Sequence, residues 1–377
     1  MKILMVSIPS LHFFRWTSQL QDAGHEVYWF DITGMSKPVE RIGWVIQKTD
    51  WKLRWSYPGR VFLKKNFPQI YNRIQKINKR NTEKVFEEYL NKIKPDVVHS
   101  FALYLSCSPI IGVMEKYPTQ KWIYSSWGSD LYYFQNDSNY LRDIKRVLPR
   151  INYLFTDCKR DYGIAQRYGF NGAFFGVFPG GGGFDIERMT NYKIPNNKRK
   201  IILIKGFQGR SGRVIPVLNA IKQLQEQLYN FEIVVFGADD EVFAFIADSE
   251  LQSWENFKVL GKIVREELIQ LMGKSRLYIG NSNSDGIPNT LLESICMDVF
   301  PIQSNPGGAT AEIIKNGVNG FLIENCENVE EIKGTITLFF KNKYLIESAI
   351  NHNFIHIIPS LGCQYLKHEV LTKYDNI

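Results

Sequence analysis

The sequence predicts an α/β protein built from two doubly wound domains, each a parallel sheet with helices on its faces. The N-terminus supplies the first observation, because an apolar run at Met1–Ile8 precedes a helix that closes at Ala23-Gly24 and a second strand at His25–Phe30. A strand, a helix and a strand within about 30 residues form a βαβ unit with parallel strands. The same alternation restarts beyond residue 180. A length of 377 residues is enough for two such domains.

The first domain is predicted to span residues 1–180. After the opening βαβ unit, helical stretches separate further apolar runs that are typical of buried strands. These runs lie at Asp96–Phe101, Lys121–Ser126, Ile151–Thr156 and Ala173–Phe178. Their order along the chain favours one doubly wound sheet.

The second domain is predicted to span residues 181–354. It follows Pro179 and the four glycines Gly180–Gly183. Four consecutive glycines lose much conformational entropy when fixed in a helix or strand, so they indicate a hinge or a close-approach loop. A helix is expected around Arg213–Leu228. The expected strands are Lys200–Lys205, Phe231–Gly237, Phe257–Leu260, Arg276–Gly280 and Val299–Gln303. We expect a helix at about 355–377 to pack back onto the first domain, and a ligand cleft between the two domains.

The composition excludes several classes of protein. With 44% hydrophobic and 22% charged residues, the chain is neither disordered nor fibrous. Its five cysteines are scattered without a C-x-x-C pair, which argues against a disulfide framework or a zinc ribbon. The pair His352 and His356 has no third ligand nearby, so no metal site is expected. We expect a cytoplasmic protein.

The positive charge is concentrated in one segment. Lys37–Lys94 holds 15 Lys/Arg against five Asp/Glu, so this segment carries +10 although the whole chain carries only +8. Trp44, Trp51 and Trp55 lie among these cations. Basic and aromatic residues together suit an anionic membrane surface, and we expect peripheral association with the inner face of the membrane. A nucleic-acid surface or an ordinary solvated face would use the same residues.

Two carboxylates stand out near the end of the second domain. A turn-rich loop carries Asp285, and a helix that begins near Asn289 carries Glu293. Ionised carboxylates only accept hydrogen bonds, and the hydroxyls of sugars are matching donors. The N-terminus of the same helix offers backbone N–H groups to an anion such as a diphosphate.

This stretch resembles the E-x7-E signature of the retaining family 4 glycosyltransferases, which have the GT-B fold of two Rossmann-like domains facing across a cleft. Further segments are similar to the strand, turn and crossing motifs of that family. They are Ser126–Asp130, Phe178–Asp185, Val299–Gly308 and Ala311–Leu322. The chain departs from the family at Asp285, where Glu is usual, and at Trp127, where His is usual.

The resemblance implies roles for individual residues. Asp285 would contact hydroxyls of the donor sugar, and Glu293 would hold the ribose of the nucleotide. Two of the three cations Lys205, Arg210 and Arg213 would bind the diphosphate, and any two of them could do so. Lys205 and Arg210 would also act in catalysis beside Asp285. The nucleotide would further contact Gly286, Ile287, Pro288, Asn289, Gly307 and Gly308. Substrate would also contact Trp127, Gly128, Asp130 and the acceptor-side loop residue His12.

The function these expectations imply is retaining, metal-independent transfer of a hexose-type sugar without a resident cofactor. The donor is a nucleotide-diphospho-sugar, and the acceptor is a glycan or a polyprenyl-linked molecule in polysaccharide or glycolipid assembly. A sugar-nucleotide epimerase and a non-catalytic GT-B protein that binds glycans or nucleotides are alternatives. We expect no nucleic-acid partner, and a steep salt dependence of binding to duplex or single strands would indicate one.

Overall fold

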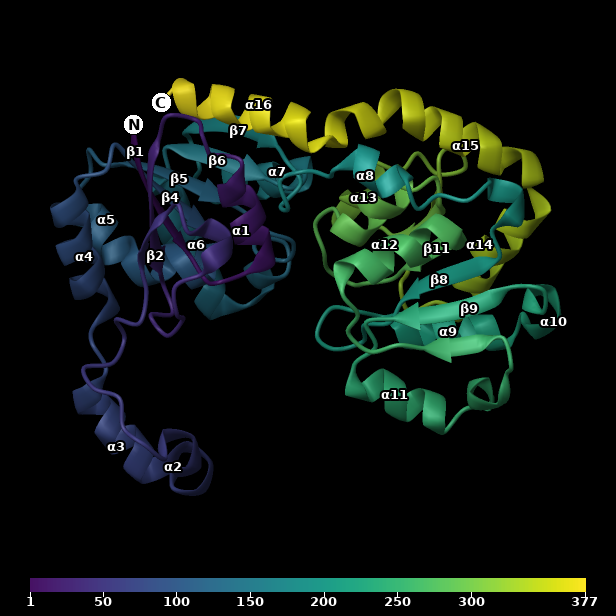
Figure 1. The fold of residues 1–377 in the computed structure, drawn as a ribbon, viewed down its shortest axis with the longest axis horizontal. Coiled ribbons are helices and arrows are strands. Elements are labelled where there is room, and N and C mark those ends of the chain that lie inside the picture. Colours follow the sequence, from purple (N-terminus) through teal and green to yellow (C-terminus); the bar gives the residue numbers. More distant parts are fainter. The chain divides into compact units, whose positions relative to one another are not determined.

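The computed structural model describes residues 1–377, apart from the side chain of Lys343, and the chain forms two compact units. The boundary between them falls within Gly180–Gly183. The first unit comprises Met1–Thr156, Asp161–Gly182 and Val370–Ile377. The second comprises Asp157–Arg160 and Gly183–Glu369. Each unit contains one parallel sheet (Figure 1).

The first unit contains a seven-stranded sheet in the order β3-β2-β1-β4-β5-β6-β7. Its strands are β1 (Lys2–Ser7), β2 (Glu26–Asp31), β3 (Ile46–Lys48), β4 (Val97–Phe101), β5 (Lys121–Ser125), β6 (Tyr153–Thr156) and β7 (Ala173–Val177). All neighbouring strands are parallel. The order reverses between β1 and β4, which is the switch point of a doubly wound sheet.

Helices cover both faces of this sheet, with α4 and α5 on one side of the strands and α1 on the other (Figure 1). They are α1 (Leu11–Ser18), α2 (Arg60–Asn66), α3 (Pro68–Asn78), α4 (Thr82–Ile93), α5 (Ile111–Lys116), α6 (Ser138–Val147) and α7 (Lys159–Arg167). Side chains of Ser10, Asn81 and Asp137 accept backbone N–H groups at the starts of α1, α4 and α6. Such caps stabilise helix ends whose N–H groups would otherwise lack partners.

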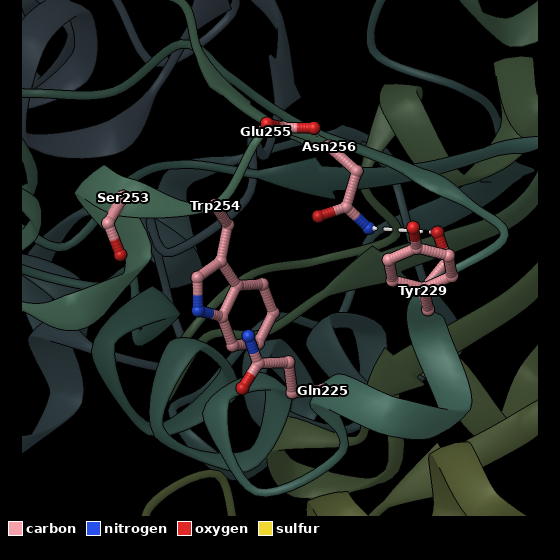
Figure 2. A pocket seen from close by; sticks show the side chains of 6 residues that line it. All are labelled: Gln225, Tyr229, Ser253, Trp254, Glu255 and Asn256. Atoms are coloured by element: carbon pink, nitrogen blue, oxygen red, sulfur yellow. Dashed lines mark hydrogen bonds between the residues drawn. The ribbon is translucent and has the colours of Figure 1, made fainter.

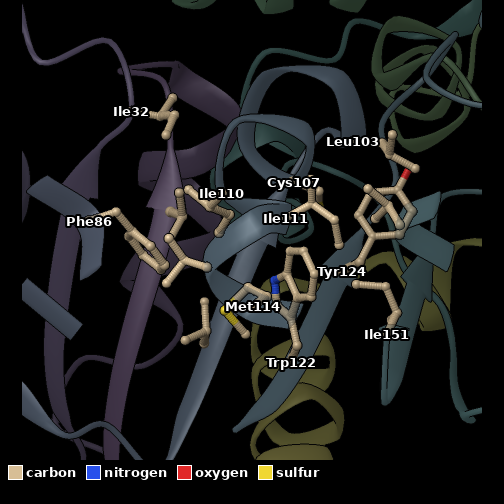
Figure 3. Close-up of a cluster of buried hydrophobic side chains, with 14 of the residues drawn as sticks. Ile32, Phe86, Leu103, Cys107, Ile110, Ile111, Met114, Trp122, Tyr124 and Ile151 are labelled. Carbon is tan, nitrogen blue, oxygen red and sulfur yellow. The ribbon is translucent and has the colours of Figure 1, made fainter. Parts of the chain in front are cut away.

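The core of the first unit lies between its sheet and the helices on one face, where Phe86, Ile110, Met114 and Trp122 pack together (Figure 3). Trp51 also belongs to this core, because its ring stacks on Phe30 at 4.9 Å. Its indole N–H donates to the carbonyl of Asp31 at 2.8 Å. Trp51 is only 3% exposed, so the expectation that it lies on a membrane-facing surface is wrong.

The second unit contains a six-stranded parallel sheet in the order β10-β9-β8-β11-β12-β13. Its strands are β8 (Ile201–Lys205), β9 (Glu232–Phe236), β10 (Phe257–Val259), β11 (Ser275–Gly280), β12 (Phe300–Ser304) and β13 (Phe321–Ile323). Its helices are α8 (Ile186–Thr190), α9 (Val214–Lys222), α10 (Gln225–Leu228), α11 (Asp240–Ala247), α12 (Arg265–Lys274), α13 (Asn289–Cys296), α14 (Val329–Lys341), α15 (Lys343–His356) and most of α16 (Cys363–Asp375). None of the helices in the described residues is both long and apolar enough to span a membrane.

The eleven strands predicted from the sequence are confirmed to within two residues at either end. The structure adds β3 and β13, which are three-residue strands at sheet edges. The single helix predicted over Arg213–Leu228 is instead two helices, α9 and α10.

The end of α16 packs into the first unit through Tyr374, which is fully buried. The Tyr374 hydroxyl lies 2.5 Å from Nδ1 of His99 and accepts from the indole N–H of Trp16 at 3.5 Å. Nε2 of His99 lies 2.8 Å from the hydroxyl of Ser125. Burial lowers the pKa of His99 well below its ordinary value, so its imidazole is neutral. Tyr374 therefore donates to Nδ1, and Nε2–H donates to Ser125.

We predict that Tyr374→Phe destabilises the first unit by about 1–3 kcal/mol, because Nδ1 of buried His99 loses its donor. Urea unfolding followed by tryptophan fluorescence would measure the loss. Tyr365→Phe is the matched control, since Tyr365 is on the same helix and half exposed. Equal stability of the two variants would contradict the account.

Candidate functional site

The candidate residues of the second unit lie at the carboxyl edge of its sheet. Strands β8, β11 and β12 are neighbours and run parallel, so the loops that follow them leave from the same edge. These loops cover residues 206–213, 281–288 and 305–309. They contain most of the positions that the sequence assigned to donor binding.

Asp285 and Lys205 meet at this edge. Oδ2 of Asp285 lies 3.7 Å from Nζ of Lys205, and the side chains are 29% and 31% exposed. Oδ1 accepts the N–H of Gly286 at 2.9 Å. The N-cap position of α13 is occupied by Pro288, which makes no side-chain cap, so Asp285 does not cap the helix. A partly exposed ion pair of this kind can exchange its partners for a ligand.

Glu293 lies on the second turn of α13, and it is 4% exposed. Its Oε1 accepts from Nε of Arg265 at 2.7 Å, and Arg265 is the first residue of α12. The sequence analysis missed Arg265, which is separated from Glu293 by 28 positions. The only available signal was general, namely that a buried carboxylate needs a cation or several donors.

The loop after β8 depends on its glycines. A Cβ on Gly206 would lie 2.6 Å from Cγ1 of Val235, and one on Gly212 would lie 1.9 Å from the carbonyl oxygen of Phe207. The carboxylate of Asp239 accepts the N–H groups of Gln208 and Gly209 at 3.1 and 3.0 Å. The loop is therefore held in one conformation beside Lys205.

The three predicted diphosphate cations differ in their surroundings. Lys205 lies beside Asp285, and Arg210 is exposed in the glycine-rich loop. The guanidinium of Arg213 forms an ion pair with Glu327 instead. Lys205 thus forms an ion pair with the predicted catalytic carboxylate, whereas Arg213 pairs with an acidic residue of another loop.

A second missed residue, Arg160, connects two of the loops. Its Nη1 donates to the carbonyl of Asp285 at 2.9 Å and to that of Pro306 at 2.7 Å. The backbone N–H of Arg160 in turn donates to Glu312 at 2.9 Å. Gly286 also approaches this segment closely, since a Cβ on it would lie 2.2 Å from Oδ2 of Asp157. The predicted nucleotide-contacting turns at 286–289 and 306–308 are thus fixed relative to each other.

Buried acceptors also gather at this edge of the sheet. The side-chain amide oxygens of Asn281, Asn283 and Gln303 are buried and have no hydrogen-bond partner within the described residues. Unpaired buried acceptors are uncommon in folded proteins because each loses its hydration.

In the first unit, His12 and Trp127 lie together. His12 is on the first turn of α1, Trp127 follows β5, and their ring centroids are 6.0 Å apart. Gly128 has φ +52°, a left-handed conformation that favours glycine. Gly180 lies close as well, since its Cβ would be 3.5 Å from Cδ1 of Trp127. The structure thus brings His12, Trp127 and Gly128 together, as the resemblance implies for a substrate-contacting group.

Asp130 differs from its neighbours because it is buried, with 3% exposure. Its Oδ2 accepts the N–H of Leu103 at 2.6 Å and the hydroxyl of Tyr124. Burial raises the pKa of Asp130 to about 7. The side chain joins β5 to the turn at Leu103, so its contacts in this structure are structural.

A surface hollow of about 480 Å³ lies elsewhere in the second unit (Figure 2). It is lined by Gln225, Tyr229, Ser253, Trp254, Glu255 and Asn256. These residues precede β9 and β10, so the hollow is at the amino edge of the sheet. It is therefore separate from the carboxyl edge that carries Lys205 and Asp285.

We predict that Asp130→Asn gains stability relative to the wild type as pH rises. Folding raises the pKa of Asp130 from 3.8 to about 7. The stability that this pKa shift contributes is therefore complete below pH 3.8 and is lost as the pH rises to about 7. The difference should grow by at most about 1.4 kcal/mol per pH unit between pH 5 and pH 7 and then level off. Thermal unfolding across this range measures it, with exposed Asp248→Asn as control. A constant difference between the variant and the wild type would contradict the prediction.

Comparisons with known proteins agree with this architecture. Residues 185–354 match the family model described as glycosyl transferases group 1. No significant match was found among the curated proteins.

Solved structures resemble the chain over its full length. A sucrose-phosphate synthase from Thermosynechococcus elongatus has a TM-score of 0.72 at 13% identity, covering 100% of this chain and 98% of that one. HepE from Anabaena, solved with UDP and glucose, has a TM-score of 0.70 at 12% identity and covers 100% of both chains. A glycosyltransferase from Rickettsia africae has a TM-score of 0.66 at 16% identity, covering 100% of this chain and 98% of that one. The chain therefore has the two-domain GT-B fold, and its residues 185–354 are similar to the group 1 glycosyl transferases.

Proposed function

We propose that the protein transfers a sugar from a nucleotide-diphospho-sugar to an acceptor hydroxyl with retention of the anomeric configuration. The observation that carries this proposal is the pairing of Asp285 with Lys205 at the edge of a group 1 glycosyl transferase domain. The adjoining helix presents the buried carboxylate of Glu293. A carboxylate, a cation and a helix N-terminus at one edge match the hydroxyls and diphosphate of such a donor.

Each residue has a distinct role in the proposal. Glu293 accepts hydrogen bonds from the ribose hydroxyls, and Asp285 accepts them from the transferred sugar. Lys205 binds the diphosphate, with Arg210 as a second cation from the same glycine-rich loop. HepE from Anabaena has been solved with UDP-glucose, which supports a donor of this chemical class.

The proposed chemistry takes place on one face of the donor sugar. The bond between the anomeric carbon and the diphosphate oxygen breaks, and the acceptor oxygen bonds to that carbon on the same face. The acceptor proton passes to the departing phosphate oxygen. Lys205 and Arg210 neutralise the charge that develops on the diphosphate, so the proposed step needs no metal ion.

The acceptor is assigned to the first unit, where His12 and Trp127 lie together. We infer a glycan or polyprenyl-linked acceptor in the assembly of a surface polysaccharide or glycolipid. The cations of the segment Lys37–Lys94 support a cytoplasmic protein that associates peripherally with the membrane.

A thermal-shift screen of nucleotide-diphospho-sugars tests the proposal first. A donor at 100 times its dissociation constant adds about 2.7 kcal/mol of stability. The donor identified in this way is then incubated with candidate acceptors, and NMR of the product reports the anomeric configuration. Inversion would exclude the retaining mechanism. Isomerisation of the donor without an acceptor would indicate an epimerase, and binding without turnover a non-catalytic protein.

We predict that Glu293→Ala weakens binding of the nucleoside diphosphate by about 1.5–3 kcal/mol, because two ribose hydroxyls lose a charged acceptor. Calorimetric titration measures the loss. Glu347→Ala, at an exposed position on α15, should bind like the wild type. An unchanged affinity in Glu293→Ala would exclude the ribose role.

We predict that Asp285→Asn lowers kcat with the donor sugar much more than it lowers affinity for the nucleoside diphosphate. The reason is that Asp285 is assigned to the sugar hydroxyls rather than to the nucleotide. Asp240→Asn, at an exposed position in the first turn of α11, is the control. Steady-state kinetics together with binding titrations separate the two effects, and a normal kcat in Asp285→Asn would refute the assignment.

A further inference from the structure

The positive charge of the first unit is most concentrated around one pair of helices. From Trp51 to Thr82 the sequence contains nine Lys/Arg residues and no Asp or Glu. The structure folds most of this stretch into α2 and α3, which lie side by side past the end of α4 (Figure 1). We call residues 52–80 the basic hairpin.

The basic hairpin also exposes bulky apolar side chains. Five of them, on or between its two helices, have exposed fractions from 48% to 75%. They are Val61, Phe62, Phe67, Ile70 and Ile77. Single exposed apolar residues are ordinary on soluble proteins, but five within 17 consecutive positions form a patch.

The spacing along α3 separates these groups onto different faces. Ile70 and Ile77 are seven residues apart and therefore share one face. Arg73 and Lys76 form a short neighbouring stripe, since they are three residues apart on this helix. The buried residues Gln75 and Asn78 lie on the face turned toward the rest of the unit. The helix is thus amphipathic, with its apolar face exposed to solvent.

The base of the basic hairpin is held by backbone pairing. Leu53 and Lys79 form an antiparallel bridge, and the N–H of Arg80 donates to the carbonyl of Lys52 at 2.8 Å. Oδ1 of buried Asn78 accepts the N–H groups of Arg54 and Trp55, each at 3.0 Å. These contacts fix the orientation of α3, so the unit presents its apolar face and cationic stripe together.

A hollow of about 340 Å³ adjoins this base. It is lined by Arg54, Arg80, Asn81, Lys84, Val85 and Glu88. The pairing just described brings Arg54 and Arg80 together, although they are far apart in the sequence. Three cations facing one carboxylate leave this hollow positive, which suits a phosphate group.

We propose that the basic hairpin docks the protein on an anionic lipid bilayer. Its exposed apolar side chains enter the boundary between headgroups and acyl chains, and its cations contact headgroup phosphates. Docking on a bilayer extends the proposed function. The link between docking and a lipid-linked acceptor rests on that proposed function. Exposed valine and isoleucine favour a bilayer over a nucleic acid, because single strands are held by cations and by stacking on aromatic rings.

Flotation with vesicles tests the docking directly. We expect the full chain to bind vesicles made of equal parts phosphatidylcholine and phosphatidylglycerol, and not vesicles of phosphatidylcholine alone. Each cation near an anionic surface changes the partition coefficient about fivefold, so reversing Lys64, Lys65, Lys76 and Lys79 to Glu should lower it more than ~100-fold. A control variant with Lys262, Lys274, Lys315 and Lys341 changed to Glu has the same net charge and should bind like the wild type.

A second variant tests insertion of the apolar face. Phe62→Ser, Ile70→Ser and Ile77→Ser combined should weaken vesicle binding by at least ~10-fold without changing the net charge. All three positions are exposed, so the thermal unfolding of this variant should match that of the wild type. Full binding by this variant, or equal loss in the charge-matched control, would overturn the proposal.

The other possible outcomes of these experiments also test the proposal. If the charge-reversed variant loses binding to single-stranded RNA, while the apolar variant keeps it and vesicles are not bound, the surface is a nucleic-acid site and the proposal is wrong. Vesicle binding is measured without donor or acceptor. A failure to bind vesicles is therefore distinguishable from a failure to detect glycosyl transfer. A failure to detect glycosyl transfer would not affect the docking proposal.

Discussion

The parallel alignment of β8 with β11 is the constraint on which the candidate site depends. Ile204 is paired with Ile279, so both strands end at the same edge and the loops that follow them leave side by side. Lys205 and Asp285, which are 80 positions apart, come within 3.7 Å for this reason. The alignment of β12 with β11 brings in the third loop, and Arg160 then joins the second and third loops through their carbonyls. The site is therefore a consequence of sheet topology, with side chains added at its edge.

The two carboxylates of the site differ in how firmly they are held. The side chain of Glu293 is 5% exposed and is bonded to Arg265 at 2.7 Å, whereas that of Asp285 is 29% exposed and lies 3.7 Å from Lys205. A buried, charge-compensated carboxylate is already oriented, so binding costs it little conformational entropy. This suits the constant part of a donor, the ribose. In the proposed function, the looser pair suits a group whose contacts change during reaction, because Lys205 would leave Asp285 to bind the diphosphate.

Local patterns in the sequence predicted the structural features that depend on residues close together along the chain. Continuous apolar runs located the inner strands, and the spacing of Asp285 and Glu293 across a helix start located the two carboxylates. The edge strands β3 and β13 escaped prediction because three residues give no periodic signal. Arg265 and Arg160 escaped because their partners are distant in the sequence. Trp51 was misassigned for a related reason, since alternating cations and aromatics do not show which ring packs against Phe30.

Trp51 and the basic hairpin show how one segment can serve two environments. The ring of Trp51 anchors the start of the segment in the core, and the bridge between Leu53 and Lys79 closes its base. Beyond this anchor the apolar side chains turn outward, and no acidic residue offsets the nine cations. Such a surface lowers solubility unless something covers it. A bilayer satisfies both the charge and the apolar face. Because the basic hairpin belongs to the same unit as His12 and Trp127, membrane contact and acceptor recognition would then be properties of one unit, and donor binding a property of the other.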